Sequence, residues 1–375
     1  MVGKGFWQDR LFTRLSPELL AGVTFGRWCR VLWENSCSVD LPFWPRACVI
    51  TMFSLRNSVA AAIEQVACQR AIRNTEVSSP LFILGIFRSG TSYLQNLLAQ
   101  DQRMAFPSMY EVTFPQTFLT TQRLDSALLG PLMPRVRPQD NVALSFDLPH
   151  EDEVAFCAML GRTFLLDMAF PRKTAFYRRY YTLRNLSSEE RADWKQAIKW
   201  FAQKLTYKHQ RPLVFKSPAH TCRIKTLLEV FPDAKFIHIH RNPYEVYRSW
   251  HHLIHTVSSR WGLQRNGNEA LGDDILQQYA EVYDAYLEER HLIPEGRLYE
   301  VAYDDLKRDP MTNMKTIYGR LALPEFAATE ATMRNYIEAD REYVKNKYAP
   351  LEDRVKQRID TEWKRFFDVW GYEHA

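Results

Sequence analysis

A short segment that combines two glycines, one arginine and three hydroxyl side chains is the strongest chemical signal in the sequence; it reads Gly85-Ile-Phe-Arg-Ser-Gly-Thr-Ser92. Its glycine spacing and its final hydroxyl match the phosphate-binding loop of nucleoside triphosphatases, but Thr91 stands where that loop carries a lysine. Arg88 supplies a cation inside the loop instead. The backbone amides of Ser89 to Ser92 would point at an anion from a helix N-terminus. The segment therefore predicts an anion site, and not a site for magnesium-bound ATP.

The elements around this segment place it at the edge of a sheet. Residues 81–84 form a short apolar run that is typical of a strand buried on both faces, and residues 91–100 have leucines at helical spacing. A strand, a glycine-containing turn and a helix follow one another. Ligands of open α/β sheets bind at the carboxyl ends of the strands, which is where this turn lies.

A second candidate anion site follows a second predicted strand, at residues 235–240. Arg241 comes directly after this strand, Asn242 is suited to cap the next helix, and Pro243 is suited to its first position. Ser249 lies two turns further along that helix. We expect Arg241 and Ser249 at the same edge of the sheet as the first segment.

Together these residues resemble the sulfotransferases that use 3′-phosphoadenylyl sulfate (PAPS). Gly85 to Ser92 is similar to the family's 5′-phosphosulfate loop, and Arg241 with Ser249 is similar to its 3′-phosphate-binding pair. The segment Val214-Phe-Lys-Ser-Pro218 is similar to the strand whose lysine contacts the bridging oxygen and the sulfonate, so the resemblance implies that role for Lys216. It implies PAPS as the co-substrate, no metal, and a donor site with these members: Arg88, Ser89, Gly90, Thr91, Ser92, Arg241 and Ser249.

The resemblance favours the bacterial and carbohydrate- or tyrosine-directed branch, whose loop reads R-S-G-T. Cytosolic enzymes have a catalytic histidine where this chain has Pro218, and their C-terminal R-K-G loop is not recognisable here. In the R-S-G-T branch a glutamate after the first helix is the base, and Glu111 matches its position.

Other side chains remain alternatives to Glu111 as the base. His150, in His150-Glu-Asp-Glu153, could act as an acid or base on the acceptor side, although the acidic residues beside it are typical of a helix start. His220, four residues after Lys216, is a third candidate. His238 and His240 alternate with isoleucines along one strand, which favours packing against a sheet face. Tyr348 is either a partner for adenine or a surface-packing residue.

The fold class that these patterns predict is α/β: an open, mainly parallel sheet flanked by helices, with the P-loop-like sulfotransferase fold. Further strands are expected at 213–215 and 297–303, and further helices at 58–73, 224–231 and 311–321. We expect a helical N-terminal extension at 1–78 and a single sulfotransferase domain at 79–375. Within that domain, 119–207 is expected to be a helical insertion that covers the acceptor, and Ser187 to Glu190 reads as a capping box.

Composition limits the partners and the compartment. The chain has 375 residues and a net charge of +5, which makes nucleic acid an unexpected main partner. The longest uncharged apolar stretch, residues 47–55, is too short to span a bilayer, and no secretory signal is present, so we expect a cytoplasmic protein. Its six cysteines are expected to be thiols in or near the core. Tryptophans mixed with arginines before residue 46 permit contact with a membrane surface or core packing. The sequence leaves the oligomeric state open.

The function expected from the resemblance is sulfonate transfer from PAPS to a hydroxyl of an acceptor that the sequence does not identify: a sugar, a lipid or another small molecule. Two alternatives remain at this point. A P-loop kinase would need a lysine at position 91 and an aspartate at the end of a neighbouring strand to hold magnesium. A non-catalytic nucleotide-binding protein of the same fold would keep the site without turnover.

Overall fold

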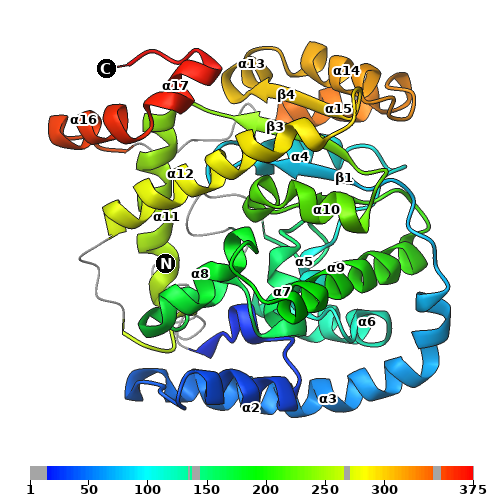
Figure 1. Cartoon of the computed structure of the whole chain (residues 1–375). Coiled ribbons are helices and arrows are strands. Elements are labelled where there is room, and N and C mark those ends of the chain that lie inside the picture. The colour runs from blue at the N-terminus through cyan, green and yellow to red at the C-terminus, as the bar shows by residue number, and fades with distance from the viewer. Residues whose placement is uncertain (1–14, 134–135, 137–143, 266–270, 341–347, 375) are drawn as a thin grey trace, which may run out of the picture. The chain divides into compact units, whose positions relative to one another are not determined.

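The computed structural model describes residues 15–133, 136, 144–265, 271–340 and 348–374 (Figure 1). The chain divides into two compact units. Unit 1 consists of Met1–Glu76, Pro107–Lys208 and Ile254–Asn268, and unit 2 consists of Val77–Phe106, His209–Leu253 and Glu269–Ala375. The expected single domain at 79–375 stays a prediction.

Unit 2 is built on a four-stranded parallel sheet with the strand order β2-β1-β3-β4. The strands are β1 (Leu81–Leu84), β2 (Val214–Lys216), β3 (Lys235–His240) and β4 (Leu298–Ala302). All four predicted strands are confirmed, and β1 is central because β2 and β3 pair with its two edges. The α/β class and the parallel sheet are confirmed as well.

Helices cover both faces of this sheet. On one face, Leu81, Ile83 and Ile237 join a core of leucines, methionines and tyrosines from α4, α14 and α15. On the other face, Phe82 stacks between Phe215 and Phe236. The helices of unit 2 are α4 (Thr91–Leu98), α10 (Ile224–Val230), α12 (Leu271–Glu289), α13 (Tyr303–Arg308), α14 (Pro310–Arg320), α15 (Ala327–Asp340), α16 (Asp353–Glu362) and α17 (Lys364–Trp370), together with the first part of α11 (Pro243–Trp261).

Unit 1 is helical in the residues that the structure describes. Its helices are α2 (Phe25–Glu34), α3 (Trp44–Arg73), α5 (Met109–Thr113), α6 (Phe118–Leu129), α7 (Glu153–Leu160), α8 (Thr174–Thr182) and α9 (Ser188–His209). The helical signals of 119–207 are thus confirmed. The predicted capping box starts α9: Ser187 N donates to Glu190 Oε2 at 3.0 Å, and Glu190 N donates to Ser187 Oγ at 3.2 Å.

The N-terminal extension differs from its prediction in one helix. We expected a helix from Ser58, whereas α3 begins at Trp44 and continues for 30 residues. With the short helix before it, the segment Leu41–Arg73 is long and apolar enough to cross a membrane, with a mean hydropathy of 1.2 and 22% burial in its most apolar window. Charged residues at 46 and 56 bound the apolar run of residues 47–55 without ending the helix, so the helix is longer than the uncharged stretch of the sequence. The expectation that no helix crosses a membrane stays a prediction.

The six cysteines form no disulfide, and all six lie in the described part of the chain. The expected core location holds only for some. Cys157 and Cys222 are buried, whereas Cys29, Cys37 and Cys48 are exposed. Cys29 and Cys48 lie on the exposed surface of α2 and α3.

Candidate active site

The glycine-rich segment forms a tight turn between β1 and α4 that needs glycine at two positions. Gly85 has φ = +146° and Gly90 has φ = +105°, a region that other residues adopt at a cost. A Cβ at Gly85 would lie 2.5 Å from the Ile239 carbonyl oxygen, and a Cβ at Gly90 would overlap the Tyr303 ring. Arg88 itself has φ = +69°. A strained non-glycine residue in a turn is typical of a functional site.

The turn presents the N-terminus of α4 at the carboxyl end of β1. Gly90 is the N-cap of α4, so the first-turn amides from Thr91 onward have no acceptor within the helix. Ser89 has partners within the turn: its amide donates to the Ile86 carbonyl at 3.2 Å, and its hydroxyl donates to the same oxygen at 2.8 Å. Its expected part in binding the donor stays a prediction. Ser89 is fully buried and closes the turn. The amide donors for an anion therefore come from the start of α4.

The two predicted anion-binding segments meet at one edge of the sheet. Arg88 Nε donates to Ser249 Oγ at 2.7 Å, and Arg241 Nη1 donates to the Arg88 carbonyl at 3.3 Å. Asn242 caps α11 as predicted: its side-chain oxygen Oδ1 accepts a hydrogen bond from Tyr244 N at 3.0 Å. Because Arg88 follows β1 and Arg241 follows β3, which pair directly, the parallel sheet is what brings them together.

Tyr303 packs against both segments. Its ring contacts the position where a Gly90 Cβ would lie, and the Arg241 guanidinium sits 4.6 Å from the ring centroid. This cation–π contact restricts the orientation of Arg241. The Tyr303-Asp-Asp-Leu306 block was read from the sequence only as support for the fold, so the contact of Tyr303 with the loop was missed.

Ser249 has a second partner across the site. Its hydroxyl and that of Tyr348 are 3.0 Å apart, and the Tyr348 ring lies 5.5 Å from the His252 ring. Tyr348 thus lies beside a candidate donor-binding residue. Its expected part in holding adenine stays a prediction.

Lys216 reaches the loop from the neighbouring strand. It ends β2, its side chain is almost completely buried, and its Nζ donates to Ser92 Oγ at 3.4 Å. Shortly after it, Thr221 accepts a hydrogen bond from Gly85 N at 2.7 Å. Thr221 carries no local motif, and only the pairing of β2 with β1 brings it to the loop. A buried lysine beside an anion-binding turn is suited to stabilise negative charge there.

The histidines of unit 2 lie in packed aromatic surroundings. The fully buried His220 ring packs edge-on against Phe82 at 5.2 Å. His238 stacks on Tyr286 at 4.1 Å and His240 on Trp370 at 5.1 Å, as the alternating strand pattern predicts. Burial lowers the pKa of His238, and it lowers the pKa of His240 to about 3.

Glu111 lies in unit 1 and both of its carboxylate oxygens are bound. It closes a capping box with Ser108, whose amide donates to Oε2 at 2.7 Å, and Lys208 Nζ donates to Oε1 at 2.6 Å. Glu111 is fully buried. These contacts hold the carboxylate in one orientation beside a cation.

His150, the other candidate of unit 1, is half-buried at the start of the segment that leads into α7. Its amide donates to the Pro107 carbonyl at 2.9 Å. Glu153 is the first residue of α7 and accepts a hydrogen bond from the Thr163 hydroxyl at 2.5 Å. The acidic residues after His150 thus start a helix, as their spacing indicates.

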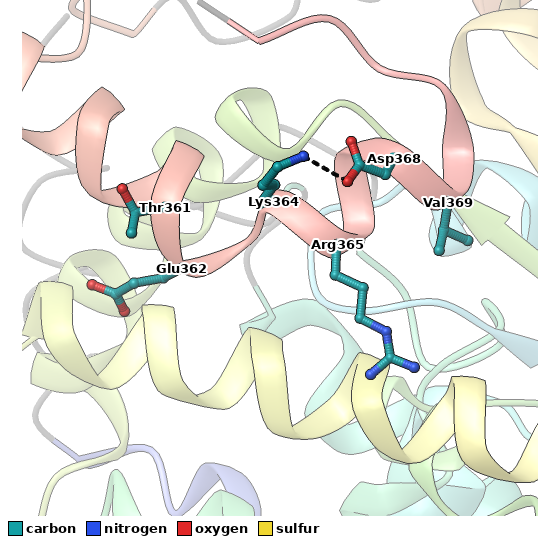
Figure 2. A pocket seen from close by; sticks show the side chains of 6 residues that line it. All are labelled: Thr361, Glu362, Lys364, Arg365, Asp368 and Val369. Carbon is teal, nitrogen blue, oxygen red and sulfur yellow. Dashed lines mark hydrogen bonds and ion pairs between the residues drawn. The ribbon is translucent and has the colours of Figure 1, made fainter.

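A surface hollow of about 540 Å³ lies elsewhere in unit 2, along α16 and α17 (Figure 2). Its charged groups are paired within α16 and α17 or with α12: Lys364 Nζ lies 2.8 Å from Asp368 Oδ2, Arg358 Nη2 lies 2.9 Å from Glu362 Oε1, and Arg365 Nη1 lies 2.8 Å from Asp284 Oδ1. The hollow is open and contains none of the predicted site residues. We therefore place the candidate site at the sheet edge, where the strand ends and the loop converge.

Among the described residues, no group of three or more histidine, cysteine, aspartate or glutamate side chains is arranged to hold a metal ion. The expected absence of a metal stays a prediction.

Comparison with known proteins gives one family. The family model described as "Sulfotransferase family" matches residues 80–328. The omega-hydroxy-beta-dihydromenaquinone-9 sulfotransferase Stf3 of Mycobacterium bovis is 33% identical over 361 residues, which are 96% of this chain and 92% of the relative. The Stf3 protein of Mycobacterium tuberculosis matches equally well.

Two solved structures share the fold. Sulfotransferase STF9 from Mycobacterium avium has a TM-score of 0.69 at 20% identity, with 94% of this chain and 97% of that chain covered. Sulfotransferase STF1 from Mycobacterium tuberculosis has a TM-score of 0.64 at 16% identity, with 90% and 92% covered. At these identities the likeness bears on the fold alone.

Proposed function

Because this chain belongs to the sulfotransferase family and is a sulfonate-transferring enzyme, we propose that its donor is PAPS and that its acceptor is a hydroxyl group on a lipid. The observation that carries the donor assignment is the meeting of two separate anion-binding segments: Arg88 contacts Ser249, and Arg241 contacts the backbone of Arg88. Two such segments at one sheet edge suit a ligand with a phosphate at each end.

In this proposal the loop holds the 5′ end of the nucleotide. The first-turn amides of α4 and the hydroxyls of Thr91 and Ser92 would bind the phosphosulfate, with Gly90 forming the turn that presents these amides. Arg241 and Ser249 would bind the 3′-phosphate. The site fits an anion because it combines a helix N-terminus, two arginines and the buried Lys216.

The bound donor supplies an activated sulfonate whose bond to the phosphate oxygen breaks as the acceptor oxygen attacks sulfur. Lys216 would stabilise the negative charge that develops on the leaving oxygen, and Arg88 would contact the sulfonate or the phosphate. The hydroxyl of the acceptor must lose a proton. We propose Glu111 as the group that accepts it, with Lys208 and the Ser108 amide as the groups that orient the carboxylate. His150 is the alternative base.

The acceptor class is supported by the Stf3 relatives, whose name gives a hydroxylated menaquinone as the substrate. The similarity extends over 96% of this chain, so it includes the helical segments outside the donor loop in which we expect acceptor recognition. A hydroxyl on a hydrophobic chain is the shared chemistry that we propose here. A cytoplasmic location is proposed with it, supported by six cysteines without a disulfide.

The sulfotransferase family removes the kinase alternative, in agreement with Thr91 at the position where a kinase loop has lysine. The remaining proposal is tested by incubating the purified chain with ³⁵S-labelled PAPS and a detergent-solubilised bacterial lipid extract. We expect release of adenosine 3′,5′-bisphosphate together with a labelled lipid. Label in added sugars or phenols, with none in the lipid fraction, would contradict the lipid acceptor while leaving the donor intact. No nucleotide release with any acceptor would contradict the PAPS assignment.

A further inference from the structure

The helix α3 has polar side chains on its buried face and apolar side chains on its exposed face. Four of its six buried residues are polar: Arg46, Ser54, Asn57 and Glu64. Its exposed large hydrophobic side chains, besides Trp44, are Met52, Leu55, Val59, Ile63 and Val66. Arg56, Gln65, Arg70 and Arg73 of the same helix are exposed as well. This is the reverse of the pattern that a surface helix of a water-soluble unit has.

Hydrogen bonds of the buried face fix the orientation of α3 on unit 1. Arg46 Nη1 donates to the Gly262 carbonyl, and Asn57 Nδ2 donates to the carbonyls of Ala21 at 2.7 Å and Val23 at 3.1 Å. Glu64 forms an ion pair with the fully buried Lys204. Rolling the helix to hide its apolar side chains would break these bonds and leave buried charges without partners.

The exposed apolar side chains form one continuous stripe. Positions 48, 52, 55, 59, 63 and 66 are three or four residues apart, so they share one face. At 1.5 Å per residue the stripe is about 27 Å long. The last of these residues, Val66, is 90% exposed, and Val59 and Met52 are 63% and 62% exposed.

Neighbouring elements extend the stripe. Trp44 and Leu41 lie at the N-terminal end of α3, and α2, which contacts α3, exposes Phe25 and Trp33. Nine of the sixteen exposed large hydrophobic side chains of the described residues fall between positions 25 and 66. Figure 1 shows α2 and α3 following one another along one border of unit 1. A monomer in water rarely leaves such a surface uncovered.

Charge on this surface points to an anionic partner. Residues 25–73 contain six arginines and three acidic residues. Each acidic side chain is paired with a cation of unit 1: Glu34 with Arg162, Asp40 with Arg172 and Glu64 with Lys204. Arg30, Arg56, Arg70 and Arg73 are exposed, and of these Arg30 pairs with Glu34 and Arg56 with Asp125. The positive charge of this surface therefore lies mainly at the C-terminal end of the stripe, at Arg70 and Arg73.

From the apolar stripe, the two exposed tryptophans and the arginines, we propose that the outer face of α2 and α3 binds the surface of an anionic lipid bilayer. Apolar side chains would enter the headgroup region, indoles prefer this interface, and arginines contact lipid phosphates. A second copy of the chain fits less well, because a two-fold interface would set the same arginines against themselves. The inference does not rest on the proposed acceptor.

The same contacts argue that α3 lies on the bilayer and does not cross it. Although Leu41–Arg73 is long and apolar enough to span, crossing would place Arg46, Asn57 and Glu64 in hydrocarbon and remove them from their partners in unit 1. Charged residues at the bilayer centre are strongly unfavourable. An interfacial position keeps the polar face on the protein and the apolar face in lipid.

The test is flotation of the full chain with vesicles of phosphatidylcholine alone or with 30% phosphatidylglycerol. We expect binding to the anionic vesicles, lowered at least tenfold in the Met52→Gln/Val59→Gln/Val66→Gln variant. The matched control is Leu292→Gln/Val369→Gln, which removes two exposed apolar side chains of unit 2 and should bind like the wild type. Arg70→Gln/Arg73→Gln should weaken binding to anionic vesicles and reduce its dependence on salt.

Sedimentation equilibrium separates the alternative occupant from lipid. If the wild type is a dimer that the triple variant converts to a monomer, and neither floats with vesicles, the surface is an interface between copies and the proposal is wrong. Equal flotation of the wild type and the triple variant would also overturn it. Circular dichroism of the variants checks that α3 remains folded, which is expected because all three positions are exposed.

Discussion

Replacing Arg241 by alanine should weaken donor binding without unfolding the sheet edge. Arg241 is held between the Tyr303 ring, 4.6 Å away, and the Arg88 carbonyl, 3.3 Å away, so its guanidinium is already oriented before a ligand arrives. Loss of one charge-assisted hydrogen bond costs about 1.5–3 kcal/mol, which corresponds to a roughly 10- to 150-fold rise in the dissociation constant. The dissociation constant of Arg241→Lys should lie between those of the wild type and Arg241→Ala, because lysine keeps the charge but loses the planar contact with the Tyr303 ring.

The assay is isothermal titration calorimetry with adenosine 3′,5′-bisphosphate. The matched control is Arg365→Ala, which removes an arginine that is paired with Asp284 beside the hollow of α16 and α17 and should leave the affinity unchanged. If Arg241→Ala and Arg88→Ala both bind like the wild type, the two segments do not form a nucleotide site. If Arg365→Ala alone weakens binding, the donor site has been placed at the wrong surface.

Three further predictions follow from other contacts. Glu111→Gln should keep donor affinity and slow transfer about 10²- to 10⁴-fold in single-turnover experiments with labelled PAPS, whereas full activity of this variant together with an inactive His150→Ala would assign the base to His150. Gly90→Ala should lower the thermal midpoint and donor affinity, because φ is +105° there and a Cβ would overlap Tyr303. The control Gly319→Ala, at a helical position with open space, should keep or raise the midpoint and leave the affinity unchanged. A wild-type midpoint and affinity for Gly90→Ala would contradict the argument. Burial lowers the folded-state pKa of His240 to about 3, below its unfolded value near 6.5. As pH drops below about 6.5, the free energy of unfolding should therefore fall by up to about 1.4 kcal/mol per pH unit through this residue. Urea titrations at pH 7 and pH 5 should show a smaller loss of stability in His240→Gln than in the wild type, and an equal loss would contradict the argument.

The sheet and its motifs could be predicted because their signals are local. The strand at 235–240, the cap at Asn242 and the loop at 85–92 are each encoded within a stretch of a few residues. The pairing of the parallel strands β1 and β3 then brings Arg88 near Arg241. Gly85 and Gly90 alone were enough to predict a tight turn.

Contacts made across the fold carried no such signal. Tyr303 packs on Gly90 from more than two hundred residues away, and Thr221 reaches Gly85 only because β2 pairs with β1. Ser89 looked like an anion-binding residue by motif, yet the turn uses both of its donors internally.

The first part of α3 and the orientation of the helix were missed for a different reason. We predicted a helix only from Ser58 and assigned no buried face to it, whereas the buried face of α3 carries Arg46, Asn57 and Glu64. The spacing of these three residues, 11 and then 7, is helical and could have indicated a polar face bound to protein. Hydrophobicity alone does not tell which face of a helix meets the protein when the other face has an apolar partner.

The most direct test of the donor site is a crystal structure of the chain with adenosine 3′,5′-bisphosphate. We predict the 5′-phosphate on the first-turn amides of α4, and the 3′-phosphate on Arg241 and Ser249. A nucleotide bound along α16 and α17, or one whose two phosphates contact only one of the two segments, would contradict the account.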